Sequence, residues 1–162
     1  MNTPINLSPV FFTVPLTGLV LALSVCGVVG GAEPLPLRTL ARGASSAITA
    51  PLRQVIKDRA AWELFWAKHT ANSLPPSQAP AVDFNRDMVI AVTMGQQRTG
   101  GYAIEIVRVE PVGPQLRVVV KPSAPRPGAM TIQALTAPFH FVAVPRSDLA
   151  PDFVDAKGHR PK

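Results

Sequence analysis

The sequence predicts an α+β fold, in which one N-terminal helix packs on four to five mostly antiparallel strands, with a partial β-sandwich as the alternative arrangement. Residues 59–69, RAAWELFWAKH, place Trp62, Phe65, Trp66 and His69 at helical spacing on one face. After residue 88 the pattern changes to short apolar runs separated by turns rich in glycine and proline, which is typical of strands.

The first 32 residues contain no charged side chain, and residues 10–32 are almost wholly apolar. A run of this length predicts either a cleaved signal peptide or a retained membrane anchor. Signal peptides normally begin with positive charge, so Met1 as the true start is left open. Cys26 offers a third option, lipid attachment, although Val25 is bulky for the position before a lipoprotein cut. We expect an exported protein that is periplasmic, extracellular or membrane-tethered.

Charge and cysteine content narrow the function classes. All 16 Lys and Arg follow residue 32, as do all 10 Asp and Glu, and the net charge is +6. The basic residues are spread singly and are not interleaved with aromatic residues, so no nucleic-acid partner is expected. Cys26 is the only cysteine, so the domain after it cannot rely on disulfides and must bury an apolar core.

The chain before and within the helical region divides into three parts. Residues 33–50 are rich in Pro, Gly, Ser and Ala, which predicts a linker or weakly ordered lead-in, with residues 37–40 as a candidate edge strand. Residues 51–57 are expected to form a short strand or an extended entry to the helix. Asp58 then stands where a helix N-cap accepts backbone N–H donors, and a proline-rich loop follows the helix.

Four strands are predicted after the helix, with residues 130–135 as a candidate fifth. They are residues 88–94, 102–110, 116–121 and 139–144. The first is a continuous apolar run, and the second is predicted to return beside it as a hairpin. Residues 51–146 are thus expected to form the domain, and residues 147–162 a flexible tail.

The histidines of the chain suggest no catalytic arrangement. His69 lies on the apolar helix face, where packing is expected. His140 alternates with Phe139 and Phe141, so its side chain is predicted to leave the opposite face of the strand as a hydrogen-bonded surface residue. His159 falls in the tail.

Asp83 and Asp87 form the nearest cluster of acidic residues, and their spacing predicts a turn whose aspartates bind backbone amides rather than a metal site. We therefore expect no enzyme, no metal site and no cofactor.

A glycine-bearing polar loop between the first two predicted strands is the candidate partner-binding site. Adjacent glycines let the backbone adopt positive φ and let another chain approach closely, while polar residues beside them offer hydrogen bonds. The alternative is a structural hairpin loop with a bulge. The candidate residues are Gln96, Gln97, Arg98, Thr99, Gly100, Gly101 and Tyr102. A second candidate is the proline-rich segment 122–128, whose stiffness lowers the ordering cost of binding.

Several landmarks of the sequence resemble the PrcB C-terminal domain family of protease-complex subunits over residues 51–146. They are the helix with Trp62, Trp66 and His69, then Val82-Asp83-Phe84, Met94-Gly95-Gln96, Thr99-Gly100-Gly101-Tyr102 and Leu135-Thr136-Ala137-Pro138-Phe139-His140. The resemblance implies an exported, often membrane-associated and non-catalytic partner of another protein. It favours an accessory or stabilising subunit of a protease or other envelope complex.

A shorter resemblance covers the segment Arg98-Thr99-Gly100-Gly101-Tyr102. It is similar to the Thr-Thr-Gly-Tyr loop that chagasin-type cysteine-protease inhibitors display on an immunoglobulin-like sandwich. Gly100 stands where the second Thr would be, and no Arg-Pro-Trp counterpart follows. This resemblance implies the alternative function of protease inhibition through the loop from Thr99 to Tyr102.

Overall fold

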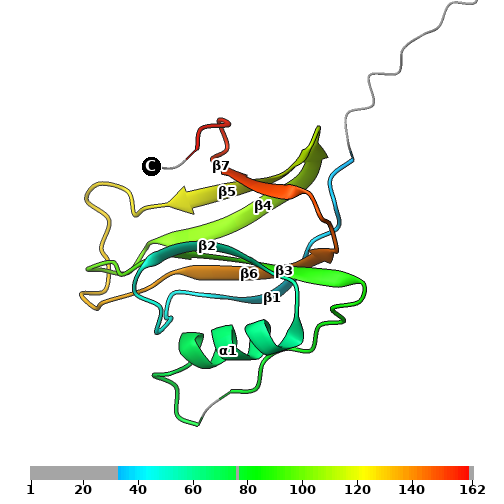
Figure 1. Cartoon of the computed structure of the whole chain (residues 1–162). Helices are drawn as coiled ribbons and strands as arrows, with labels where there is room; N and C mark the ends of the chain where they lie inside the picture. The colour runs from blue at the N-terminus through cyan, green and yellow to red at the C-terminus, as the bar shows by residue number, and fades with distance from the viewer. Residues whose placement is uncertain (1–32, 76, 161–162) are drawn as a thin grey trace, which may run out of the picture.

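The computed structural model of the protein describes residues 33–75 and 77–160. The predicted N-terminal segment, including Cys26, lies outside these residues. Strands make up 42% of the structure and helix 9%. Two sheets are stacked on each other, and the helix lies on the outer face of one of them (Figure 1). None of the helices in the described ranges has the length and apolar character needed to cross a membrane.

Seven strands and one helix follow one another along the described chain. They are β1 Arg38–Gly43, β2 Pro51–Ile56, α1 Arg59–His69, β3 Asp87–Met94, β4 Ala103–Val112, β5 Gln115–Ser123, β6 Phe139–Pro145 and β7 Ala150–Val154. The first sheet has the order β1-β6-β3-β2 and is antiparallel throughout. The second has the order β4-β5-β7, in which β5 and β7 are parallel.

The space between the sheets is filled by aliphatic side chains that alternate along the strands. Met88, Ile90 and Val92 of β3 belong to the same buried cluster as Ile104 and Val118 of the facing sheet. Alternation places their neighbours Val89 and Ala91 on the other face of the first sheet. That face would be exposed without a further layer, and α1 covers it.

Helix α1 buries its aromatic face against the first sheet. Trp62 and Phe65 meet Phe141 of β6 edge-on, with ring centroids 6.1 and 5.1 Å apart. The predicted helix over residues 59–69 is confirmed. The predicted N-cap is confirmed too, because Oδ1 of Asp58 accepts a 2.8 Å hydrogen bond from the N–H of Ala61.

The predicted α+β class is wrong, because the structure is mostly β and is built from two sheets. Strand β7 falls in the segment predicted to be a flexible tail, and β1 in the segment predicted to be a linker, where residues 37–40 are only a candidate edge strand. Both strands are short, lie in segments without clear alternation, and pair with β5 and β6 respectively, far away in sequence. Pairing of this kind leaves no local period to detect.

The predicted hairpin between β3 and β4 is also wrong. Strand β3 pairs with β2 and β6, whereas β4 pairs with β5 in the other sheet. The connection over residues 95–102 therefore crosses from one sheet to the other at one end of the sandwich. The candidate strand over residues 130–135 is absent from this part of the structure, where an isolated bridge joins Gln97 and Thr136 instead.

His140 lies on the opposite face of β6 from Phe139 and Phe141, but the prediction of a surface histidine is wrong because His140 is only 3% exposed. Its Nδ1 accepts a 2.9 Å hydrogen bond from the N–H of Ile106 on β4. The proton therefore sits on Nε2, which lies 3.1 Å from Oγ1 of Thr39 on β1. The imidazole thus joins the two sheets.

Candidate partner-binding site

The predicted partner-binding site, residues 96–102, forms a loop that we call the recognition loop. It lies at the end of the sandwich where β3 ends and β6 begins (Figure 1). Gln96, Arg98 and Gly101 are exposed there. The other four residues of the predicted site contribute less surface, since Gln97, Thr99 and Tyr102 are half-buried and Gly100 is buried. The loop thus combines exposed polar groups with residues that hold its shape.

Two neighbouring loops brace this one, and together they form a surface that we call the loop end: residues 44–50, 95–102 and 124–138. Gln97 and Thr136 exchange two backbone hydrogen bonds of 2.7 and 3.0 Å. The N–H of Gln96 donates to the carbonyl of Thr49 at 2.8 Å, and the hydroxyl of Thr136 donates to the carbonyl of Thr99 at 2.9 Å. Backbone bonds on both sides therefore fix the position of the loop.

The paired glycines allow the loop over residues 124–138 to pack directly on the recognition loop. Gly101 has a φ of +85°, and a Cβ there would lie 2.9 Å from Cβ of Pro125. A Cβ at Gly100 would lie 2.6 Å from Cγ1 of Ile132. The glycines thus have a structural role in this loop.

Replacing Gly101 with alanine should therefore destabilise the protein by about 1 to 3 kcal/mol, since the new methyl group adds a steric clash to the strain of a positive φ. The matched control is Gly128→Ala, because Gly128 has a similar φ of +78° but no atom within 4 Å of its Cβ position. Urea denaturation of both variants measures the difference. Equal losses of stability in the two variants would show that the loop over residues 124–138 moves aside freely at Gly101.

Residues 88–145 match the PrcB C-terminal family. The match confirms the resemblance over a shorter range than residues 51–146. It runs from β3 through β6, and so contains two of the three loops of the loop end. No curated protein and no solved structure matches the chain.

Sequence reasoning missed three residues of this surface within the PrcB C-terminal match. Met130, Ile132 and Leu135 are exposed apolar side chains in the loop between β5 and β6. They fall in residues 130–135, which the sequence predicts only as a candidate strand. Only the position of this loop outside both sheets shows that the side chains face solvent, and no local signal in the sequence reveals it.

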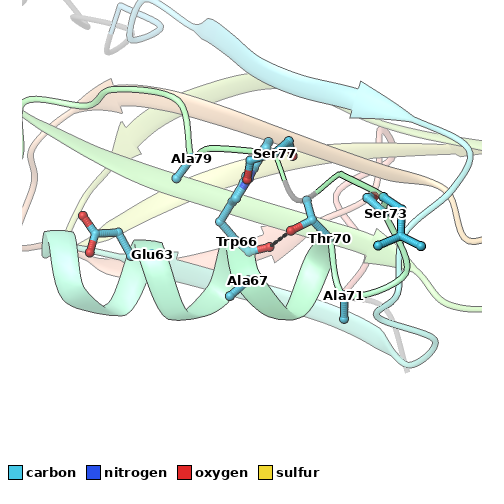
Figure 2. A pocket seen from close by; sticks show the side chains of 9 residues that line it. Glu63, Trp66, Ala67, Thr70, Ala71, Ser73, Ser77 and Ala79 are labelled. Atoms are coloured by element: carbon cyan, nitrogen blue, oxygen red, sulfur yellow. Dashed lines mark hydrogen bonds between the residues drawn. The ribbon is translucent and has the colours of Figure 1, made fainter.

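A pocket of about 390 Å³ beside α1 lies outside the PrcB C-terminal match (Figure 2). Its walls come from α1 and the following loop, and include Trp66, Thr70 and Leu74. The hydroxyl of Thr70 donates to the carbonyl of Trp66, and Nε1 of Trp66 donates to the carbonyl of Ser77, both at 2.9 Å. Among the described residues that line the pocket, Glu63 is the only ionisable one, and the hydroxyl of Thr70 and the indole N–H of Trp66 are already hydrogen-bonded.

Ser46 and His69 have the spacing of a nucleophile and base, with Oγ and Nδ1 2.8 Å apart. Burial lowers the pKa of His69 to about 4, which makes it a weak base at neutral pH. Its ring is packed against Phe139, with centroids 4.2 Å apart. Oγ of Ser46 also accepts the N–H of Ile48 at 3.1 Å. The pair therefore connects α1 to the loop over residues 44–50.

The segment around Asp83 forms the predicted turn, because Oδ1 of Asp83 accepts the N–H of Asn85 at 3.1 Å. Within residues 33–75 and 77–160, no three His, Cys, Asp or Glu side chains come together in a way that could hold a metal ion.

Proposed function

We propose that the protein is an exported, non-catalytic protein-binding module that serves as an accessory or stabilising subunit of a protease complex. The family match carries this proposal, because it points to a protein associated with a protease complex. The uncharged apolar segment before residue 33 supports export, and membrane association through that segment.

The contact surface in this proposal is the recognition loop from Gln96 to Tyr102. Its backbone is already fixed by hydrogen bonds to residues 49, 132 and 136, so the loop would lose little conformational entropy on binding. Gln96 and Arg98 extend into solvent and offer both donors and an acceptor. These features suit a surface that recognises a folded protein.

A bulky residue at position 96 tests this surface. Gln96→Trp should reduce co-purification of the full-length protein with its protease complex, because the indole fills the space that a partner would occupy. The matched control is Gln54→Trp at the exposed edge of β2, which should leave co-purification unchanged. If Gln96→Trp co-purifies as well as the wild type, the loop is not the contact.

Protease inhibition is the second candidate function. It is favoured by one observation: the loop from Thr99 to Tyr102 joins the two sheets at one end of a β-sandwich, the setting that the chagasin-type resemblance implies. Adding the purified protein to the co-purified protease separates the two functions. A fall in peptidase activity indicates an inhibitor, whereas unchanged activity with a longer protease lifetime indicates a stabilising subunit.

A further inference from the structure

We infer that the loop end binds an acidic protein surface around an apolar contact made by Met130, Ile132 and Leu135. This inference rests on the proposed function and names the chemistry of the partner. It extends the contact surface from the recognition loop to the loop between β5 and β6, which packs against it.

The three side chains that form this apolar contact, Met130, Ile132 and Leu135, are unusually exposed for apolar residues. Met130 is fully exposed, and Ile132 and Leu135 are each 69% exposed, within six residues of one loop. The other exposed large apolar side chains are spread over different elements, such as Leu64 on α1 and Val107 on β4. A local concentration of exposed apolar groups marks an interaction surface.

The loop that carries these side chains is held in a defined conformation. The carbonyl of Ile132 accepts the N–H of Gly100 at 3.0 Å, and the N–H of Ala129 donates to the carbonyl of Arg126 at 3.0 Å. Pro125 lies over the bare face of Gly101. The apolar side chains therefore sit on a braced loop, which reduces the entropy lost on binding.

The charged residues around the apolar contact are all positive. Within residues 44–50, 95–102 and 124–138 the charged side chains are Arg98 and Arg126, both exposed, and this set contains no Asp or Glu. An acidic partner would be attracted to this surface, and a basic one repelled.

A polar hollow of about 260 Å³ adjoins the apolar contact at Leu135. Ser45, Thr49, Asn72 and Gln96 line it, and their hydroxyl and amide groups can donate hydrogen bonds. None of the described residues that line the hollow is acidic. Its size suits one side chain of a partner, and its donors suit a carboxylate.

The position of the loop end favours a protein over a membrane as the partner. The described chain begins at the opposite end of the sandwich, where the N–H of Leu35 donates a 2.7 Å hydrogen bond to the carbonyl of Val109 on β4 before the chain enters β1 (Figure 1). A protein held at a membrane through residues 1–32 would therefore direct its loop end away from the bilayer.

Site-specific photocrosslinking of the full-length protein in its own cells tests the inference. A benzoylphenylalanine is placed at Met130 or Ile132, and at Leu64 or Val107 as exposed controls on other faces. We expect crosslinks from Met130 and Ile132 to a second protein, mapped by mass spectrometry to segments rich in Asp and Glu. Crosslinks to lipid, to another copy of this chain or to a segment without acidic residues would overturn the inference.

The control positions separate this inference from the proposed function. Crosslinks to a protease-complex protein from Leu64 or Val107 alone would refute the loop end as the contact but keep the subunit role. The absence of protein crosslinks from Met130 and Ile132 would refute the inference, whereas the subunit role is tested separately by co-purification with the protease complex.

Charge reversal provides a second readout with a matched control. Arg98→Glu with Arg126→Glu should reduce the Ile132 crosslink by about tenfold, because both arginines would then repel the acidic partner. Arg59→Glu with Lys68→Glu makes the same charge change on the exposed face of α1 and should leave the crosslink intact. Equal reductions in the two double variants would contradict a local role for Arg98 and Arg126.

Discussion

Replacing Trp62 with alanine is expected to lower the free energy of unfolding by about 3 to 5 kcal/mol. Trp62 is only 2% exposed and packs against Phe65, Trp66 and Phe141. Its Nε1 donates a 3.0 Å hydrogen bond to the carbonyl of Pro80, so the substitution also removes a partner from that carbonyl. Urea denaturation followed by fluorescence or circular dichroism measures the loss.

The same helix supplies the control. Leu64 is 66% exposed, so Leu64→Ala, which also shortens an apolar side chain of α1 to a methyl group, should change the stability by less than about 0.5 kcal/mol. Similar small losses for both variants would show that α1 is not an integral part of the core.

The aromatic cluster under α1 also supports the loop end. Phe139 and Phe141 are buried in this cluster at the start of β6, directly after the loop that carries Leu135. The carbonyl of Pro138 accepts the N–H of Met94 at 2.9 Å, which ties the beginning of β6 to the end of β3. The helix thus fixes the strand from which the candidate contact extends.

The elements with a strong local pattern could be predicted from the sequence. Helix α1 has apolar residues at helical spacing after a capping Asp58, and β3 to β6 are apolar runs bounded by turns. The assignment of strands to sheets could not be predicted in this way. The pairings of β1 with β6 and of β5 with β7 join distant segments, and the period of a strand does not specify its partner.

The candidate site, too, could be predicted from the sequence only where it carries a local signal. Gly100 and Gly101 beside polar residues marked the recognition loop, because glycine pairs and polar side chains are visible in the sequence. Met130 and Ile132 were not recognised, because an alternating apolar pattern is expected to face a core and its exposure depends on the surrounding fold.

Acidification should destabilise the protein between about pH 6.5 and pH 4, because two buried histidines are neutral in the folded state. Burial lowers the pKa of His69 from its ordinary value of 6.5 to about 4. Burial, followed by the charge of Arg42, also lowers the pKa of His140, while Glu105 opposes this shift. The unfolded chain therefore binds more protons than the folded one in this pH range, and stability falls as protons are added.

The stability conferred by neutral His69 is complete above pH 6.5 and is lost as the pH falls towards 4. At about 1.4 kcal/mol per pH unit the loss from His69 approaches 3 kcal/mol, and His140 adds to it. Urea denaturation at a series of pH values measures the slope. His69→Phe should flatten the profile, because the substitution removes the titrating imidazole while keeping an aromatic ring in the cluster. A wild-type profile that is flat across this range would contradict the neutral packing of both buried histidines.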